Sequence, residues 1–205
     1  MELKTRLYTI EDECASLIEE VSEYIYEHAE LVNEEYKSSA YLVEQLEKQG
    51  FTITYPYLDI PTAFRAELVC GDGPKVAFLA EYDALPGYGE DNCQVAHDCG
   101  HNWIAASTFG AAISLAHMKD VISGSIVVIG TPAEETTGGK YDLVERGAFD
   151  DIDAAIQMHL GAENNIHVVT LAMDSLEFNF KGVAAHAAAY PEKGINALDG
   201  VQLMF

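Results

Sequence analysis

Apolar residues recur at helical spacing in two segments at the start of the chain. The first segment covers residues 9–28 and has Thr9 where a helix cap is expected. At the three- and four-residue spacing of an amphipathic helix, its apolar face carries Ile10, Cys14, Leu17, Val21 and Ile25. The second segment, residues 34–49, ends before Gly50, a residue type that terminates helices. We therefore predict two helices, whose solvated faces carry much of the acidic excess.

The middle of the chain alternates between strand-like and helix-like patterns. Short apolar or alternating runs predict strands at residues 51–55, 65–70, 75–81, 125–130 and 154–158. The last three are apolar enough to be buried strands. Helical patterns predict helices at residues 102–119 and 140–146. The run GDGP at 71–74 is typical of a hairpin turn between its two flanking strands. This order of elements predicts an α/β layered domain.

The pattern changes after residue 171. We predict a strand at 175–180, a loop of small residues at 182–191 and a helix at 194–205. One strand and one helix cannot bury a core by themselves. We therefore assign residues 1–171 to an α/β domain and residues 172–205 to the incomplete start of a second domain.

The charge balance excludes several classes of partner. Lys and Arg total 11 whereas Asp and Glu total 34, giving a formal net charge of −23. Such a chain repels phosphate, so we expect neither nucleic acid nor anionic membranes as partners. The sequence shows no apolar run of membrane-spanning length and no signal-peptide core at its start. Its four cysteines form no CxxC pair, so we expect reduced thiols and a cytoplasmic protein.

Side chains that can bind metal follow the three predicted buried strands, where each one ends. Glu81 and Asp83 follow the first, the pair Glu134 and Glu135 follows the second, and His159 follows the third. In open α/β sheets, sites form at the carboxyl ends of parallel strands. We therefore expect these side chains to converge, joined by the run HDCGHN at 97–102 that leads into a helix.

The tripeptide Cys99-Gly100-His101 combines a thiol and an imidazole across a glycine. The glycine permits a tight turn that aims both side chains at one point, and the helix N-terminus favours the thiolate. Thiolate, imidazole and carboxylate together suit Zn²⁺ or Mn²⁺. Taken alone, the tripeptide fits a buried structural cysteine and a helix-capping histidine better than a metal site.

The adjacent carboxylates of Glu134 and Glu135 repel one another unless a cation or a proton intervenes. One could bind metal while the other takes a proton from water, although a solvated acidic loop is the alternative. His159, taken alone, is more typical of a hydrogen-bonded core residue than of a ligand. His97 is a candidate to orient a neighbouring ligand, and His186, in a loop of small residues, is a candidate to contact substrate.

Four runs, in this order and spacing, resemble the M20 metallopeptidase family in its amidohydrolase branch. They are DALP at 83–86, HDCGHN at 97–102, GTPAEE at 130–135 and AHA at 185–187. The resemblance covers nearly the whole chain. It implies a zinc-peptidase α/β domain with an inserted α+β lid domain that pairs two subunits into a homodimer.

The resemblance also implies a site that holds two divalent metal ions, Zn²⁺ or Mn²⁺. Its metal ligands would be Cys99, His101, Glu135 and His159. Glu134 would be the general base, Asp83 would orient a ligand from behind the site, and His186 would stabilise the oxyanion in the partner subunit. The implied reaction is hydrolysis of the amide bond of an N-acyl amino acid or a small dipeptide by metal-activated water.

The chain departs from the family pattern in three ways. Family members are longer, and a further ligand histidine lies after their lid, beyond the segment that this sequence contains. Glu81 stands where related peptidases carry a different side chain. The resemblance therefore predicts a truncated chain and leaves an alternative function, a catalytically silent fragment that acts as an interaction or assembly module through its exposed apolar residues.

Overall fold

The computed structural model describes residues 2–135, 138–166, 172, 174 and 176–205. The chain divides into two compact units, Met1–Ala162 and Glu163–Phe205. The boundary that we predicted, at residue 171, lies outside the described residues. No helix in the described part of the chain is long and apolar enough to cross a membrane.

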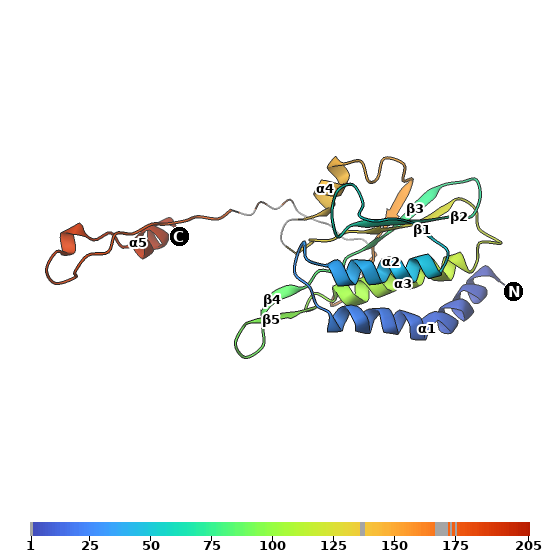
Figure 1. Ribbon diagram of the computed structural model, residues 1–205, viewed down its shortest axis with the longest axis horizontal. Helices are drawn as coiled ribbons and strands as arrows, with labels where there is room; N and C mark the ends of the chain where they lie inside the picture. Colours follow the sequence, from blue (N-terminus) through green and yellow to red (C-terminus); the bar gives the residue numbers. More distant parts are fainter. Residues whose placement is uncertain (1, 136–137, 167–171, 173, 175) are drawn as a thin grey trace. The chain divides into compact units, whose positions relative to one another are not determined.

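The first unit is built on a mixed sheet, drawn edge-on in Figure 1. In spatial order, its strands are β1 (Thr52–Thr54), β2 (Phe64–Val69), β6 (Ser125–Gly130), β3 (Lys75–Ala80) and β7 (Ala154–Ile156). Strand β3 runs parallel to both β6 and β7, whereas β1 and β2 run antiparallel to their neighbours. The predicted α/β class is confirmed, and the carboxyl ends of three parallel strands meet at one edge.

Helices cover both faces of this sheet (Figure 1). On one face lie α2 (Tyr36–Lys48) and α3 (His101–Ala116), with α1 (Leu3–Glu27) packed against α3. Alternate residues of β3 point to opposite faces, so Phe78 packs against the helical core whereas Leu79 packs with Leu143 of α4 (Lys140–Glu145). The prediction that β3 is covered on both faces is confirmed.

The first helix begins six residues earlier than predicted. Thr9 does not cap it, because the Thr9 hydroxyl donates to the carbonyl of Thr5 within the helix. Arg6 forms an ion pair with Asp120 at an N–O distance of 2.6 Å, which ties the early turns to the segment after α3. Farther along, Val21 and Ile25 are fully buried, and each contributes about 2 kcal/mol of hydrophobic stabilisation.

The predicted hairpin between β2 and β3 is wrong, because β6 lies between these two strands. The turn at 71–74 instead folds over the start of β6. Cys70 donates its N–H to the carbonyl of Gly124, and Ser125 donates its N–H to the carbonyl of Pro74. Residues 126–129 of β6 are all buried, and a strand this apolar is stabilised by two neighbours and two covered faces.

Two further expectations are wrong. Strand β7 is exposed rather than buried, because it pairs with β3 alone and lies at the edge of the described sheet. Residues 176–180, within the predicted strand at 175–180, form no strand, and Ser175 lies outside the described residues. A two-stranded ladder of β4 (Leu85–Tyr88) and β5 (Gln94–Ala96) was not predicted.

The described residues of the second unit contain little regular structure. A 3₁₀ turn covers Pro191–Lys193, and α5 covers Ala197–Met204. The Asn196 side chain caps α5 by accepting the N–H of Leu198. An isolated bridge joins Val183 to Ile195.

Candidate metal centre

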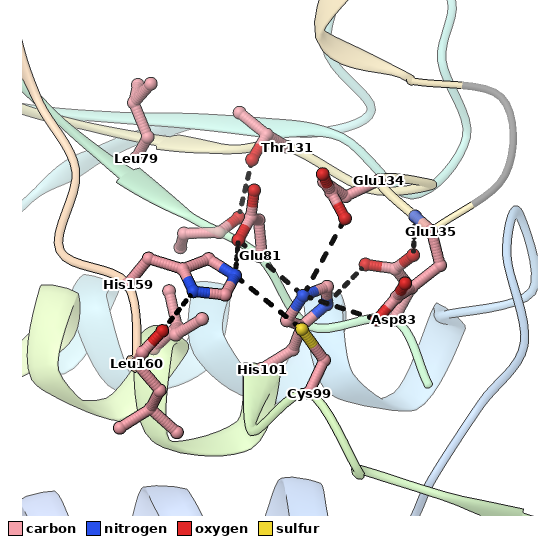
Figure 2. A network of polar contacts seen from close by, with 12 residues as sticks. Leu79, Glu81, Asp83, Cys99, His101, Thr131, Glu134, Glu135, His159 and Leu160 are labelled. Atoms are coloured by element: carbon pink, nitrogen blue, oxygen red, sulfur yellow. Dashed lines mark hydrogen bonds and ion pairs between the residues drawn. The ribbon is translucent and has the colours of Figure 1, made fainter. Parts of the chain in front are cut away.

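Side chains from four separate segments converge at the carboxyl edge of the parallel strands (Figure 2). Glu81 and Asp83 follow β3, whereas Glu134 and Glu135 follow β6. His159 follows β7, and Cys99 and His101 lie at the start of α3. The structure therefore brings together the four predicted ligands, the predicted base and the predicted orienting aspartate, all within the first unit.

His101 lies at the middle of this cluster and is fully buried. Its Nε2 atom lies 3.6 Å from Glu135 Oε1, 3.7 Å from Glu81 Oε2 and 3.9 Å from Glu134 Oε2. His159 Nε2 lies 3.7 Å from Cys99 Sγ and 3.8 Å from Glu81 Oε2. The nitrogen–oxygen contacts are longer than hydrogen bonds, whereas the contact of Cys99 with His159 is within the range of a weak sulfur hydrogen bond. All of them resemble the separations between atoms that share a metal ion.

Both histidines present the same nitrogen to the cluster. Asp83 Oδ1 lies 2.9 Å from Nδ1 of His101, and the carbonyl oxygen of Leu160 lies 2.8 Å from Nδ1 of His159. Because those oxygens accept, each neutral ring carries its hydrogen on Nδ1 and its lone pair on Nε2. This is the tautomer in which an imidazole binds metal while a neighbouring oxygen fixes the ring.

Asp83 connects two of the converging segments. Its Oδ1 accepts from His101, and its Oδ2 accepts the backbone N–H of Glu135 at 2.9 Å. Burial alone would raise the pKa of Asp83, but the hydrogen bonds from His101 and Glu135 lower it below its ordinary value. Burial lowers the pKa of His101, whereas the contact with Asp83 raises it, and the net shift is upward. Asp83 is therefore an ionised carboxylate that fixes a ring and a loop.

Three buried polar atoms in this cluster have no hydrogen-bond partner among the described residues. They are Glu81 Oε2, His101 Nε2 and Glu135 Oε1. Leaving a buried acceptor unpaired costs free energy, and leaving several acceptors facing one another costs more. A cation at their meeting point would satisfy all three. The residues present therefore fit a divalent metal centre with mixed sulfur, nitrogen and oxygen ligands.

Gly100 gives the Cys99–His101 segment its shape. Its φ of 73° lies in the left-handed region, and a Cβ at this position would clash with Leu160. The tight turn aims both flanking side chains into the cluster (Figure 2), as the sequence predicted.

The expectation that the helix N-terminus favours a Cys99 thiolate is wrong for the metal-free chain. Burial, followed by the charge of Glu135, raises the pKa of the Cys99 thiol to about 11. Burial and the nearby carboxylates together outweigh any stabilisation of the thiolate by the helix dipole.

Glu134 and Glu135 differ in their surroundings. The Glu134 side chain is 39% exposed and the Glu135 side chain is 15% exposed. Burial and the charge of Glu81 raise the pKa of Glu134. A more accessible carboxylate with a raised pKa is better suited to proton transfer, and a more buried one is better suited to holding a metal.

The two remaining predicted histidines, His97 and His186, supply no ligand atom to this cluster, although His97 lies close enough to Asp83 and His101 for their charges to affect its pKa. His97 is buried, and its Nε2 lies 3.1 Å from the carbonyl oxygen of Ile25 in α1. Burial lowers its pKa. His186 belongs to the second unit, where its Nδ1 accepts the backbone N–H groups of Ala188 and Ala189.

Two residues that contact the site were not predicted from the sequence. Lys140 forms an ion pair with Glu81, and the buried Glu35 accepts the N–H of Ala133, immediately before the glutamate pair. Lys140 stands in the first turn of its helix, where a positive charge is unfavourable, and this is a local signal that could have been noticed. Glu35 gives no such signal, because it is one of many acidic residues around α2.

Comparison with known proteins relates this site to a family. The model of peptidase family M20/M25/M40 matches residues 77–196. The chain is 38% identical to Xaa-Arg dipeptidase of Mus musculus, a match that covers 99% of this chain and 48% of that protein. It is 37% identical to one of the p-aminobenzoyl-glutamate hydrolase subunits of Escherichia coli, over 90% of this chain and 41% of that protein.

A solved structure supports the same relationship. A Bacillus subtilis protein, described as a dinuclear metal-binding peptidase of the M20 family, aligns with a TM-score of 0.64 and 27% identity. The alignment covers 70% of this chain and 42% of that one. The chain spans about half the length of the curated relatives it matches. Because the family match takes in more than half of the chain and every residue of the cluster, this chain belongs to peptidase family M20/M25/M40.

Proposed function

We propose that this chain carries the metal centre of an M20 amidohydrolase. The substrate would be an N-acyl amino acid or a small dipeptide, and the bond cleaved would be its amide. The names of the relatives support this substrate class, since they include a dipeptidase and a hydrolase of an acylated glutamate.

One observation carries the proposal. Glu81 Oε2, His101 Nε2 and Glu135 Oε1 are buried without hydrogen-bond partners in the described part of the chain, and they face one another. Cys99 and His159 complete a second group of ligand atoms that shares His101. An imidazole nitrogen binds one ion, so two ions would divide these ligands between them and share a carboxylate or a water.

Two divalent ions, Zn²⁺ or Mn²⁺, would supply Lewis acidity that lowers the pKa of water and polarises the scissile carbonyl. We assign Cys99, His101, Glu135 and His159 as the ligands of these ions. Glu134 would take a proton from the attacking water and deliver it to the leaving nitrogen. Its partial exposure and raised pKa support this role. Asp83 would hold His101 and the Glu135 backbone in place.

His186 would stabilise the oxyanion. Because its Nδ1 accepts two backbone N–H groups, the neutral ring carries its hydrogen on Nε2. That N–H is the kind of donor that an oxyanion requires. The role needs the lid domain of a second subunit, so we propose a homodimer as the active form.

The test combines metal analysis with a hydrolysis assay. The chain is loaded with Zn²⁺ or Mn²⁺ and offered an Xaa-Arg dipeptide, p-aminobenzoyl-glutamate and an N-acetyl amino acid. We expect Glu134→Ala to abolish turnover while leaving the metal content close to that of wild type. Glu145→Ala, which removes an exposed glutamate of α4, is the matched control and should change neither quantity. Loss of metal in Glu134→Ala would show that the roles of Glu134 and Glu135 are exchanged.

A second candidate function, a catalytically silent association module, is favoured by the exposed apolar side chains of the second unit. Phe178 is 56% exposed and Leu203 is 88% exposed. Two metal ions per chain, together with turnover, support the hydrolase. One metal or none, without turnover and with self-association in sedimentation, supports the module.

A further inference from the structure

Glu81 carries a buried carboxylate whose two oxygens face different partners. Its side chain is 2% exposed. Oε1 forms an ion pair with the ammonium group of Lys140, whereas Oε2 has no hydrogen-bond partner in the described part of the chain. Oε2 instead faces Nε2 of His101 at 3.7 Å and Nε2 of His159 at 3.8 Å (Figure 2). Oε1 therefore has a positively charged partner, whereas Oε2 points towards the lone pairs of two imidazole rings.

Lys140 is placed where its helix does not favour it. It is the first residue of α4, at the positive end of the helix dipole, where a lysine is destabilising. Its side chain is 27% exposed and crosses to the end of β3, 59 residues earlier in the chain. The ion pair with Glu81, rather than the helix, explains a lysine at this position.

We propose that Glu81 is a further ligand of the metal centre and that Lys140 is a positioning residue that turns Oε2 towards it. This inference rests on the proposed function, because it assigns a role toward the same metal ions. Atoms that share a tetrahedral Zn²⁺ ion lie about 3.4 Å apart, and Oε2 is separated from both imidazole nitrogens by nearly that distance. The oxygen is already placed as a ligand, with no rearrangement of the loop.

A purely structural Glu81–Lys140 ion pair explains the observations less well. Such a pair is stable when the remaining lone pairs of the carboxylate are also satisfied. Here Oε2 is buried without a partner and lies among acceptors, which destabilises the metal-free chain. A bound cation removes that cost and also accounts for the direction in which the carboxylate points.

Titration calorimetry of the metal-free chain with Co²⁺ tests the proposal without requiring activity. We expect Glu81→Gln to weaken binding about tenfold or more, or to remove one of two equivalents of metal. We expect Lys140→Met to weaken binding by a smaller factor and Lys140→Arg to restore it. Lys48→Met is the matched control, because Lys48 forms an exposed ion pair with Glu44 on α2. It should bind Co²⁺ as wild type does.

The visible absorption of bound Co²⁺ gives an independent readout, because its intensity reports the number and type of ligands. We expect an altered spectrum in Glu81→Gln. Wild-type affinity and an unchanged spectrum in that variant would overturn the proposal and leave the proposed function standing, whereas a wild-type chain that binds no Co²⁺ would overturn both. If Glu81→Gln fails to fold, Lys140→Met decides, and wild-type affinity in it overturns the proposal.

Discussion

The backbone N–H of Ala133 donates a hydrogen bond of 2.9 Å to the buried carboxylate of Glu35, 98 residues earlier in the chain. The same carboxylate accepts the N–H of Asn33 and the hydroxyl of Thr62. Ala133 has a φ of 62°, in the left-handed region, and directly precedes the glutamate pair of the metal centre. Glu35 therefore holds the strained residue Ala133 in place, and the position of Ala133 determines where Glu134 and Glu135 lie.

Replacing Glu35 should loosen this loop. Glu35→Ala leaves three donors without their acceptor, and we expect a loss of about 3 kcal/mol in the free energy of unfolding. Glu35→Gln should lose less, because its amide oxygen can still accept while its NH₂ group donates to Thr62. Urea denaturation measures the difference, with Glu34→Ala, an exposed neighbour, as the control. Equal stability of wild type and Glu35→Ala would contradict this account.

A methyl group at Gly100 should damage the site as well as the fold. Gly100→Ala places a Cβ in a left-handed conformation and against Leu160, which together should destabilise the chain by about 2–4 kcal/mol. Either the turn or the Leu160 side chain must move to relieve the clash. The turn carries Cys99 and His101, and Leu160 adjoins His159, so either movement should disturb the ligands. We expect weakened Co²⁺ binding and loss of the thiolate–Co²⁺ absorption band.

Gly50 provides a matched control for this substitution. It also has a positive φ, 89°, but a Cβ there would meet nothing within 4 Å. Gly50→Ala should therefore lower the free energy of unfolding only through its strained backbone conformation, by about 1 kcal/mol, and leave Co²⁺ binding unchanged. If both variants bind Co²⁺ equally well, the shape of the turn at Gly100 does not determine the site.

Asp83 should control metal affinity without binding metal. In Asp83→Asn, only one side-chain oxygen remains to accept from His101 and from the Glu135 backbone, where the carboxylate provides two. We expect Co²⁺ affinity to fall about 10- to 100-fold, as for other residues that orient a ligand. Calorimetry at constant pH measures this loss. Wild-type Co²⁺ affinity in Asp83→Asn would contradict this prediction.

Local patterns predicted the pieces of this site better than their assembly. Cys99, His101 and His159 could be identified because strand ends and a glycine turn are visible in a short window of sequence. The edge at which they meet follows from the parallel pairing of β3 with β6 and β7, a general property of α/β sheets.

Pairings between distant segments could not be predicted in this way. The turn at 71–74 has hairpin chemistry, yet β6 separates its two strands, because the apolar residues of β6 are better buried in the middle of the sheet. Glu35 and Lys140 contribute through contacts with residues 98 and 59 positions away. No periodicity or spacing in a single sequence reports such contacts.

Asp151 should make the stability of the chain depend on pH. Arg65 hydrogen-bonds both of its carboxylate oxygens, at 2.8 and 2.9 Å, and Lys75 lies 2.9 Å from Oδ2. These contacts hold the pKa of Asp151 well below its ordinary value. A carboxyl whose pKa is lowered by folding stabilises the folded state above its unfolded pKa, about 3.9, and loses that contribution as the pH falls further.

The comparison of wild type with Asp151→Asn isolates this contribution. We expect wild type to be the more stable chain at about pH 6, and the difference in unfolding free energy to shrink steadily below about pH 4. The Asp151 side chain is 49% exposed, so solvent screens the interaction, and added salt should reduce the difference further. Urea denaturation at several pH values measures it. A difference that stays constant down to about pH 2 would mean that the shifted carboxyl is not its source, because protonation of Asp151 in the unfolded chain must already reduce the difference below about pH 4.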